Sequence, residues 1–251
     1  MEVGYWTEHG NGPALLLVHG GMCDHTIWDA QVDVLAETFR VITLDLPGHG
    51  RSHAMQARAD FENYVAAVDS VRAAARADRV ALVGHAMGAT IVSLYARLHP
   101  LRAAALVGVE GDLDPRTMPQ MNPGWNTGAL DEAAREMIVR SKFTPDTPDD
   151  VRSKLLTVAL ATPEETAIAI RSAKMRERGR RYPQSDVPAL AIYGASSKLP
   201  DEVLVRSSLS NYESRQIDGT GPFLMMERPD EFSDALSGFL IRVGYSAAGS
   251  D

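Results

Sequence analysis

Short runs of residues, either almost wholly apolar or alternating with period two, recur along the chain and are soon followed by glycine or aspartate. Such runs are typical of strands in a sheet that is covered on both faces. We expect strands at residues 14–18, 40–44, 80–83, 103–109, 189–193 and 212–217. Residues 2–8 also alternate with strand period, and the turn-rich break at 9–13 predicts a hairpin into the strand at 14–18.

Apolar residues spaced three and four positions apart lie between these runs and predict amphipathic helices. Helices of the α/β core are expected at residues 28–37 and 61–78, after the turn at 84–88 as far as His99, and at 229–243. Proline supports two of these boundaries, because Pro100 stops the third helix and Pro229 suits the first turn of the last one. The alternation of strands and helices predicts an α/β fold with a mostly parallel sheet.

The pattern changes between residues 113 and 186, where proline and asparagine come first and three helical stretches follow. Those stretches are residues 130–141, 149–160 and 163–178. We therefore expect a helical cap at 113–186, inserted into an α/β core made of 1–112 and 187–244. Residues 245–251 are expected to form a flexible tail.

Charge and cysteine content narrow the class of protein. The 251 residues carry a net charge of -8, which argues against nucleic acid or an anionic membrane as partner. A single cysteine, Cys23, excludes an internal disulfide, and the first residues resemble no signal segment. No apolar run reaches the roughly 20 residues of a membrane helix. We expect a cytoplasmic protein with a small-molecule partner, and the oligomeric state stays open.

The stretch that follows residues 80–83 is the most informative part of the chain. It reads Gly84-His85-Ala86-Met87-Gly88 and runs into an alanine-rich helix. In enzymes with a G-x-S-x-G turn at this place, the central residue is a serine raised above the sheet as the nucleophile. Here the frame of that turn is present and its centre is Ala86.

Four motifs in order give the chain a family resemblance. They are His19-Gly20-Gly21, residues 45–52, residues 84–88 and residues 227–232. Together they resemble the α/β-hydrolase superfamily over nearly the whole chain. The resemblance implies an eight-stranded, mostly parallel sheet with a lid over the pocket, and a serine, acid and histidine as the catalytic triad.

The resemblance also places the triad in this sequence. The family acid usually lies three residues after the glycine that ends the penultimate strand, and counting from Gly194 gives Ser197. The family histidine usually lies five residues before the glutamate of an E-x-P segment, and counting back from Glu227 gives Pro222. The resemblance therefore implies that all three triad positions are substituted, as Ala86, Ser197 and Pro222.

Backbone donors do not depend on the triad side chains. The N–H of Met87 at the helix start and that of Gly21 or Met22 in the glycine loop would form the oxyanion site. Such a site suits a lyase, decarboxylase or cyclase that stabilises an oxyanion or enolate of a small apolar carbonyl compound or ester-like metabolite.

Acid–base groups would have to come from elsewhere in the chain. His25 and Asp24 lie on the loop that borders the substrate in the family, and His85 lies beside the elbow. Each has a structural alternative, as a loop that hydrogen-bonds itself or as a packed histidine. Cys23 as a nucleophile is a weaker hypothesis, because a lone cysteine is commonly a small buried apolar residue.

Substrate-binding candidates come from the cap and from strand ends. Glu110 and Asp112 follow the strand at 103–109. A methionine-rich set with one tryptophan would line an apolar cavity, and its members are Met22, Met87, Met118, Met121, Met225, Met226 and Trp125. Their alternatives are capping and ordinary core packing. The histidines show no metal-ligand spacing, so we expect neither a metal nor another cofactor.

Two other functions stay open at this point. One is a non-catalytic pseudo-hydrolase that binds a ligand or a protein. The other is a serine esterase represented by an inactive Ala86 variant, although three substituted triad positions favour natural divergence over a single engineered change.

Overall fold

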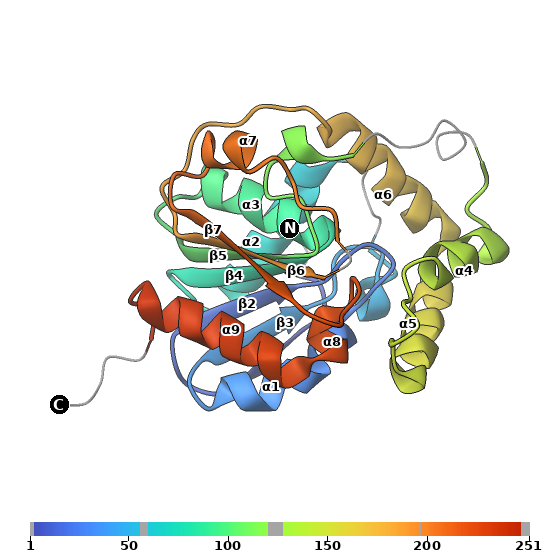
Figure 1. The fold of residues 1–251 in the computed structure, drawn as a ribbon, viewed down its shortest axis with the longest axis horizontal. Helices are drawn as coiled ribbons and strands as arrows, with labels where there is room; N and C mark the ends of the chain where they lie inside the picture. The colour runs from blue at the N-terminus through green and yellow to red at the C-terminus, as the bar shows by residue number, and fades with distance from the viewer. Residues whose placement is uncertain (1–2, 56–59, 120–127, 196, 247–251) are drawn as a thin grey trace.

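The computed structural model describes residues 3–55, 60–119, 128–195 and 197–246. Within them the chain forms a seven-stranded sheet with helices on both faces (Figure 1). The strands are β1 Trp6–His9, β2 Ala14–Val18, β3 Arg40–Leu44, β4 Val80–His85, β5 Ala103–Val109, β6 Ala189–Gly194 and β7 Tyr212–Ile217. The helices are α1 Asp29–Ala36, α2 Phe61–Ala74, α3 Met87–Leu98, α4 Glu132–Arg140, α5 Asp149–Ala161, α6 Glu164–Glu177, α7 Glu202–Arg206, α8 Leu224–Glu227 and α9 Pro229–Arg242.

The strand order is β1-β3-β2-β4-β5-β6-β7, and every neighbouring pair is parallel except β1 with β3. The expected hairpin was therefore wrong, because both edges of β2 are taken by β3 and β4 and β1 pairs with β3 instead. The link between β1 and β2 crosses the end of α1 closely. A Cβ on Gly10 would lie 2.3 Å from the carbonyl oxygen of Phe39. The described residues form seven strands, where the resemblance implied eight.

Two apolar cores lie on the two faces of the sheet. Side chains of a strand alternate between faces, so Leu15 and Leu17 of β2 pack on one side and Leu16 and Val18 on the other. The first pair shares its core with α1 and α9, and the second with α2 and α3. Figure 1 shows the sheet between these two helix pairs. All four residues are fully buried, which fits the unbroken apolar run.

Helices α4, α5 and α6 come between β5 and β6, where the sequence predicts the cap. In Figure 1 they stand together at one side of the sheet, away from α7 and from the C-terminus. The turn between β4 and α3 and the segment after β5 both lie at the carboxyl ends of parallel strands, which is where open α/β sheets bind ligands. Among the described residues, none of the helices has the length and apolar character that crossing a membrane requires.

The C-terminal segment is anchored at its first residue. Tyr245 donates a hydrogen bond from its hydroxyl to the carbonyl oxygen of Ala14 over 2.7 Å. The expected flexible tail therefore does not begin at 245, because this contact ties Tyr245 to the start of β2. Residues 247–251 lie outside the described part of the chain.

Candidate functional site

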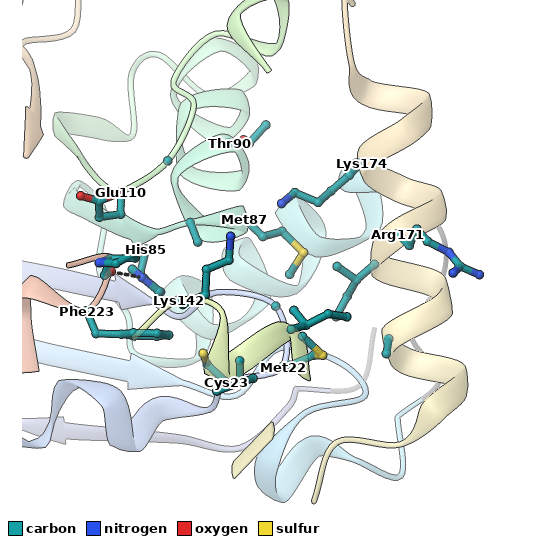
Figure 2. A pocket seen from close by; sticks show the side chains of 18 of the residues that line it. Met22, Cys23, His85, Met87, Thr90, Glu110, Lys142, Arg171, Lys174 and Phe223 are labelled. Carbon is teal, nitrogen blue, oxygen red and sulfur yellow. Dashed lines mark hydrogen bonds between the residues drawn. The ribbon is translucent and has the colours of Figure 1, made fainter. Parts of the chain in front are cut away.

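A cavity of about 350 Å³ lies between the strand ends and the cap. The sheet side supplies its floor from the glycine loop, the elbow and the segment after β5, and the cap supplies the opposite wall (Figure 2). Its lining is mainly apolar on the cap side, where it includes Leu130, Ile138, Val139, Leu155, Ala167 and Ile170. The site is thus a concave, largely apolar pocket with a few polar groups, as small-molecule sites usually are.

Ala86 lies at the floor of this cavity in a conformation that L-residues rarely adopt. Its φ is 49° and its ψ is -111°, and it immediately precedes α3. The flanking glycines are required because helix and strand close tightly around the turn. A Cβ on Gly84 would lie 2.2 Å from the carbonyl oxygen of Gly88, and one on Gly88 would lie 2.5 Å from that of Val18. The strained turn is a nucleophile-elbow geometry with a methyl group at its tip.

Three backbone N–H groups border the same cavity without a hydrogen-bond acceptor in the described part of the chain. They belong to Gly21 and Met22 in the glycine loop and to Met87 at the start of α3. Met22 has a φ of 57°, so the loop turns sharply at this point. The N-terminus of α3 adds the positive end of a helix dipole. These three groups form an edge of the cavity at which the hydrogen-bond donors come from the backbone alone.

Ser197 lies in the segment after β6 and meets Glu110, which follows β5. The Ser197 hydroxyl lies 2.6 and 2.7 Å from the two carboxylate oxygens of Glu110, and the N–H of Gly194 donates to the same carboxylate. Burial raises the pKa of Glu110, and the charge of Glu227 adds to that increase, although both hydrogen bonds oppose it. A carboxyl group therefore stands beside the position expected for the family acid, supplied by a different strand.

Pro222 lies in the segment between β7 and α8 and borders the cavity. Its carbonyl oxygen accepts a hydrogen bond from Nε2–H of His85 over 2.9 Å. Nδ1 of His85 is buried and has no partner among the described residues. Burial lowers the pKa of His85 to about 4, so the ring is neutral at pH 7. His85 therefore supports the backbone at Pro222 and carries no charge into the cavity.

Lys174 and Lys142 both line the cavity, and neither is among the candidates that the sequence indicates. Lys174 lies on α6, and Lys142 follows α4; Figure 2 shows both reaching toward Met87. Burial lowers the pKa of Lys174, Lys142 lowers it further, and the charge of Asp112 opposes the decrease. One signal for Lys174 was available, because it lies four residues after the buried Ile170 and thus on the same helical face.

Asp112 completes the group of charged residues at the cavity. Its carboxylate accepts a hydrogen bond from the Thr117 hydroxyl over 3.0 Å. Burial raises the pKa of Asp112, while the Thr117 hydrogen bond and the charge of Lys174 oppose that increase. The environments of Asp112 and Lys174 thus bring the pKa values of an acid and a base closer together.

His25 and Asp24 are not among the residues that line the cavity. Nδ1 of His25 lies 2.8 Å from a carboxylate oxygen of the buried Asp45, and Asp24 caps the turn by accepting from Thr26. Burial disfavours the charged ring of His25, but the hydrogen bond and charge of Asp45 outweigh it and raise its pKa. Asp24, His25 and Asp45 each have a side-chain atom that could bind a metal, and these atoms lie within 4.8 Å of one another. Both carboxylates, however, already accept hydrogen bonds from backbone N–H groups.

Cys23 lines the cavity but is buried, and burial raises its pKa to about 12. It is therefore a protonated, weakly nucleophilic thiol at neutral pH.

Met225 does not lie where the sequence analysis expects it. It is fully buried in the core that α1 and α9 share and is absent from the cavity lining, because α8 turns it toward the sheet. Met121 and Trp125 lie outside the described residues.

The family model for the alpha/beta hydrolase fold matches residues 13–155, more than half of the chain. The chain belongs to the α/β-hydrolase fold family. Within this family it is similar to the pimeloyl-[acyl-carrier protein] methyl ester esterase of Methylococcus capsulatus, with 34% identity over 181 residues, covering 72% of this chain and 65% of the relative.

A second relative is the (E)-2-((N-methylformamido)methylene)succinate hydrolase of Acinetobacter baylyi. It is 33% identical over 109 residues, which cover 42% of this chain and 41% of that enzyme. The chain thus spans less than two thirds of the length of either relative. Among solved structures, the epoxide hydrolase CorEH superposes with a TM-score of 0.80 over 95% of this chain and 94% of its own, at 18% identity. That likeness concerns the fold alone.

Proposed function

We propose that the cavity binds a small, largely apolar carbonyl compound and stabilises the oxyanion or enolate formed from it. The protein would then act as a lyase, decarboxylase or cyclase without a serine nucleophile. The observation that carries the proposal is that the N–H groups of Gly21, Met22 and Met87 lie at one cavity edge and have no acceptor among the described residues. Fixed donors stabilise developing negative charge without reorganising, and losing one typically costs about 2.7–4 kcal/mol of transition-state stabilisation.

The groups around the elbow support chemistry without a covalent serine intermediate. We infer that Ala86, Ser197 and Pro222 occupy the three triad positions. A methyl group is no nucleophile, and proline offers no side-chain base. The Glu110 carboxylate is already engaged by Ser197 and Gly194. In well-studied cases the triad accounts for about 10⁶-fold in rate, so its loss argues against ordinary ester hydrolysis.

Asp112 is the group that we propose for proton transfer, and the positive charge of Lys174 acts on it from the cap. Both border the cavity, and burial shifts the pKa of the carboxyl upward and that of the amine downward. An acid or base works best when its pKa lies near the working pH. The neutral His85 is held by Pro222, and His25 is held by Asp45 outside the lining, so neither is better placed.

Turnover of a panel of small oxo acids, ketones and esters, followed by mass spectrometry, tests this function. Asp112→Asn should lower the rate by about 10²–10⁴-fold, the usual contribution of a positioned acid or base. Asp186→Asn is the matched control, since Asp186 is exposed and bonded only to Ser210 and Asn211 in the described structure. Equal rates for the two variants would contradict the role of Asp112.

The absence of a nucleophile at Ala86 also favours a second function, binding without conversion. A receptor-like protein should be stabilised against unfolding by the compound that it binds, and should release that compound chemically unchanged. Recovery of unchanged ligand at concentrations that saturate the protein would therefore replace the catalytic proposal by this one.

A further inference from the structure

Two cationic side chains from different cap elements converge on the cavity. Lys142 follows α4 and is exposed to solvent, whereas Lys174 on α6 is only partly exposed. Figure 2 shows both side chains extending from the cap toward Met87, the residue that begins α3. The chain has four lysines, and these two are the ones that line the cavity.

Neither ammonium group makes a hydrogen bond or an ion pair within 4.0 Å with a side chain or carbonyl among the described residues. The other cap lysine, Lys154, does so, because its Nζ lies 2.7 Å from a carboxylate oxygen of Asp29. The charge of the partly buried Lys174 is costly beside apolar walls, and the like charge of Lys142 adds to that cost. An anion bound between Lys142 and Lys174 would remove both costs.

The other charged groups of the cavity do not fill this place. Glu110 is engaged by Ser197 and by the N–H of Gly194. Asp112 attracts Lys174 without an ion pair within 4.0 Å in the described structure, and accepts from Thr117. Arg171 donates from Nη1 to the carbonyl oxygen of Gly128 over 2.7 Å, and in Figure 2 its end points away from Met87.

We propose that Lys142 and Lys174 hold a carboxylate of the substrate, so that the natural ligand is an oxo acid or another carbonyl compound with one negative charge. Glu110 and Asp112 line the same cavity and offset part of the positive charge of the two lysines, which suits a monoanion better than a phosphate dianion. The apolar side chains of Leu155, Ile170 and Phe223 would contact the hydrocarbon part. The assignment of a carbonyl group rests on the proposed function, whereas the carboxylate site does not.

Calorimetric titration with octanoate and with octanamide tests the site apart from any turnover. The two compounds have the same chain, and neither contains a ketone to react. Octanoate should bind at least about tenfold more tightly than octanamide, as charge-assisted hydrogen bonds are stronger than neutral ones. Lys142→Gln and Lys174→Gln should each remove most of that preference and leave the affinity for octanamide unchanged.

Lys154→Gln is the control with the same change of net charge, and both affinities should stay as in the parent protein. Lys174→Met provides a second variant that replaces the charge by a side chain suited to apolar surroundings and is expected to fold at least as well. Equal affinity of the parent protein for octanoate and octanamide would overturn the proposal. Displacement of octanoate by inorganic phosphate at equal concentration would overturn the choice of a carboxylate.

Failure of this inference and failure of the proposed function give different results. If no carbonyl compound is turned over but octanoate still binds through the lysines, the carboxylate site stands and the catalytic proposal fails. If turnover depends on Asp112 while octanoate and octanamide bind equally, the catalytic proposal stands and the substrate is neutral.

Discussion

Ala86 keeps the backbone strain of a nucleophile elbow while carrying no nucleophile. Positive φ at a residue other than glycine costs on the order of 1–3 kcal/mol, which the surrounding fold must supply. Gly84 and Gly88 make that possible by letting α3 approach β4 and β2. The consequence lies in the backbone, because the turn keeps the N–H of Met87 at the cavity edge. We propose that the retained geometry serves these donors rather than a hydroxyl.

At this residue, Ala86→Ser alone should leave the protein inactive toward p-nitrophenyl acetate and unlabelled by fluorophosphonate probes. The proposed triad positions offer no side-chain base to take the proton of the new hydroxyl, because Pro222 stands where the family has its histidine. The combination of Ala86→Ser with Pro222→His should raise ester hydrolysis by about 10²-fold or more, the usual gain from a general base. Glu110 would orient the introduced imidazole.

The combination of Ala86→Ser with Pro222→Ala serves as the control for a changed backbone at 222. Strong fluorophosphonate labelling of the single Ala86→Ser variant would contradict our interpretation, since it would require a base that the proposed triad positions lack.

Helices α2 and α3 and the start of β5 are joined by one carboxylate. Asp69 of α2 lies 2.7 Å from Nε of Arg72 and accepts from the hydroxyl of Tyr95 and from Arg102 over 2.8 Å. Burial opposes ionisation, but these hydrogen bonds outweigh it and lower the pKa of Asp69 from 3.8 to about 2. The link therefore depends on the charged form of the carboxylate.

Because the pKa of Asp69 is lower in the folded state, its contribution to stability is fully present above pH 3.8 and is lost as the pH falls through about 2. Asp69→Asn should therefore reduce the free energy of unfolding at pH 7 by about 2 kcal/mol, and should flatten its decline below pH 4. Urea unfolding of the parent and variant at pH 7 and pH 3 measures both effects. A difference as large at pH 3 as at pH 7 would show that the charge of Asp69 plays no part.

The sequence predicted most elements because their signals are local. Six apolar or alternating runs became β2 to β7, and Pro229 does begin α9. The partner of β1 was not predictable in this way, since pairing depends on which edge of β2 is free. The positions of Lys142 and Lys174 depend on how the cap packs over the strand ends, and Ser197 meets Glu110 only because β5 and β6 are neighbours. These contacts join distant segments, so local patterns carry little information about them.

At the scale of the whole molecule, the net charge of -8 contrasts with the lysines gathered at one cavity. Screening limits interactions between exposed charges to about 10 Å at 0.1 M salt, so the overall negative charge does little to repel an anion close to the cap. The core then supplies the N–H groups at the floor, and the cap supplies Lys142 and Lys174. A ligand that contacts both parts would bind with its carbonyl group toward the core.

The most direct test of the account is hydrogen–deuterium exchange at the carbon next to a ketone, followed by proton NMR in D₂O. An enolate must form for this exchange, whatever reaction the protein completes afterwards. We predict that the protein accelerates exchange in 2-octanone and more strongly in 7-oxooctanoate, and that Asp112→Asn abolishes the acceleration whereas Asp186→Asn does not. Exchange no faster than in buffer for both compounds, at concentrations that saturate the cavity, would contradict the claim that this site stabilises an enolate.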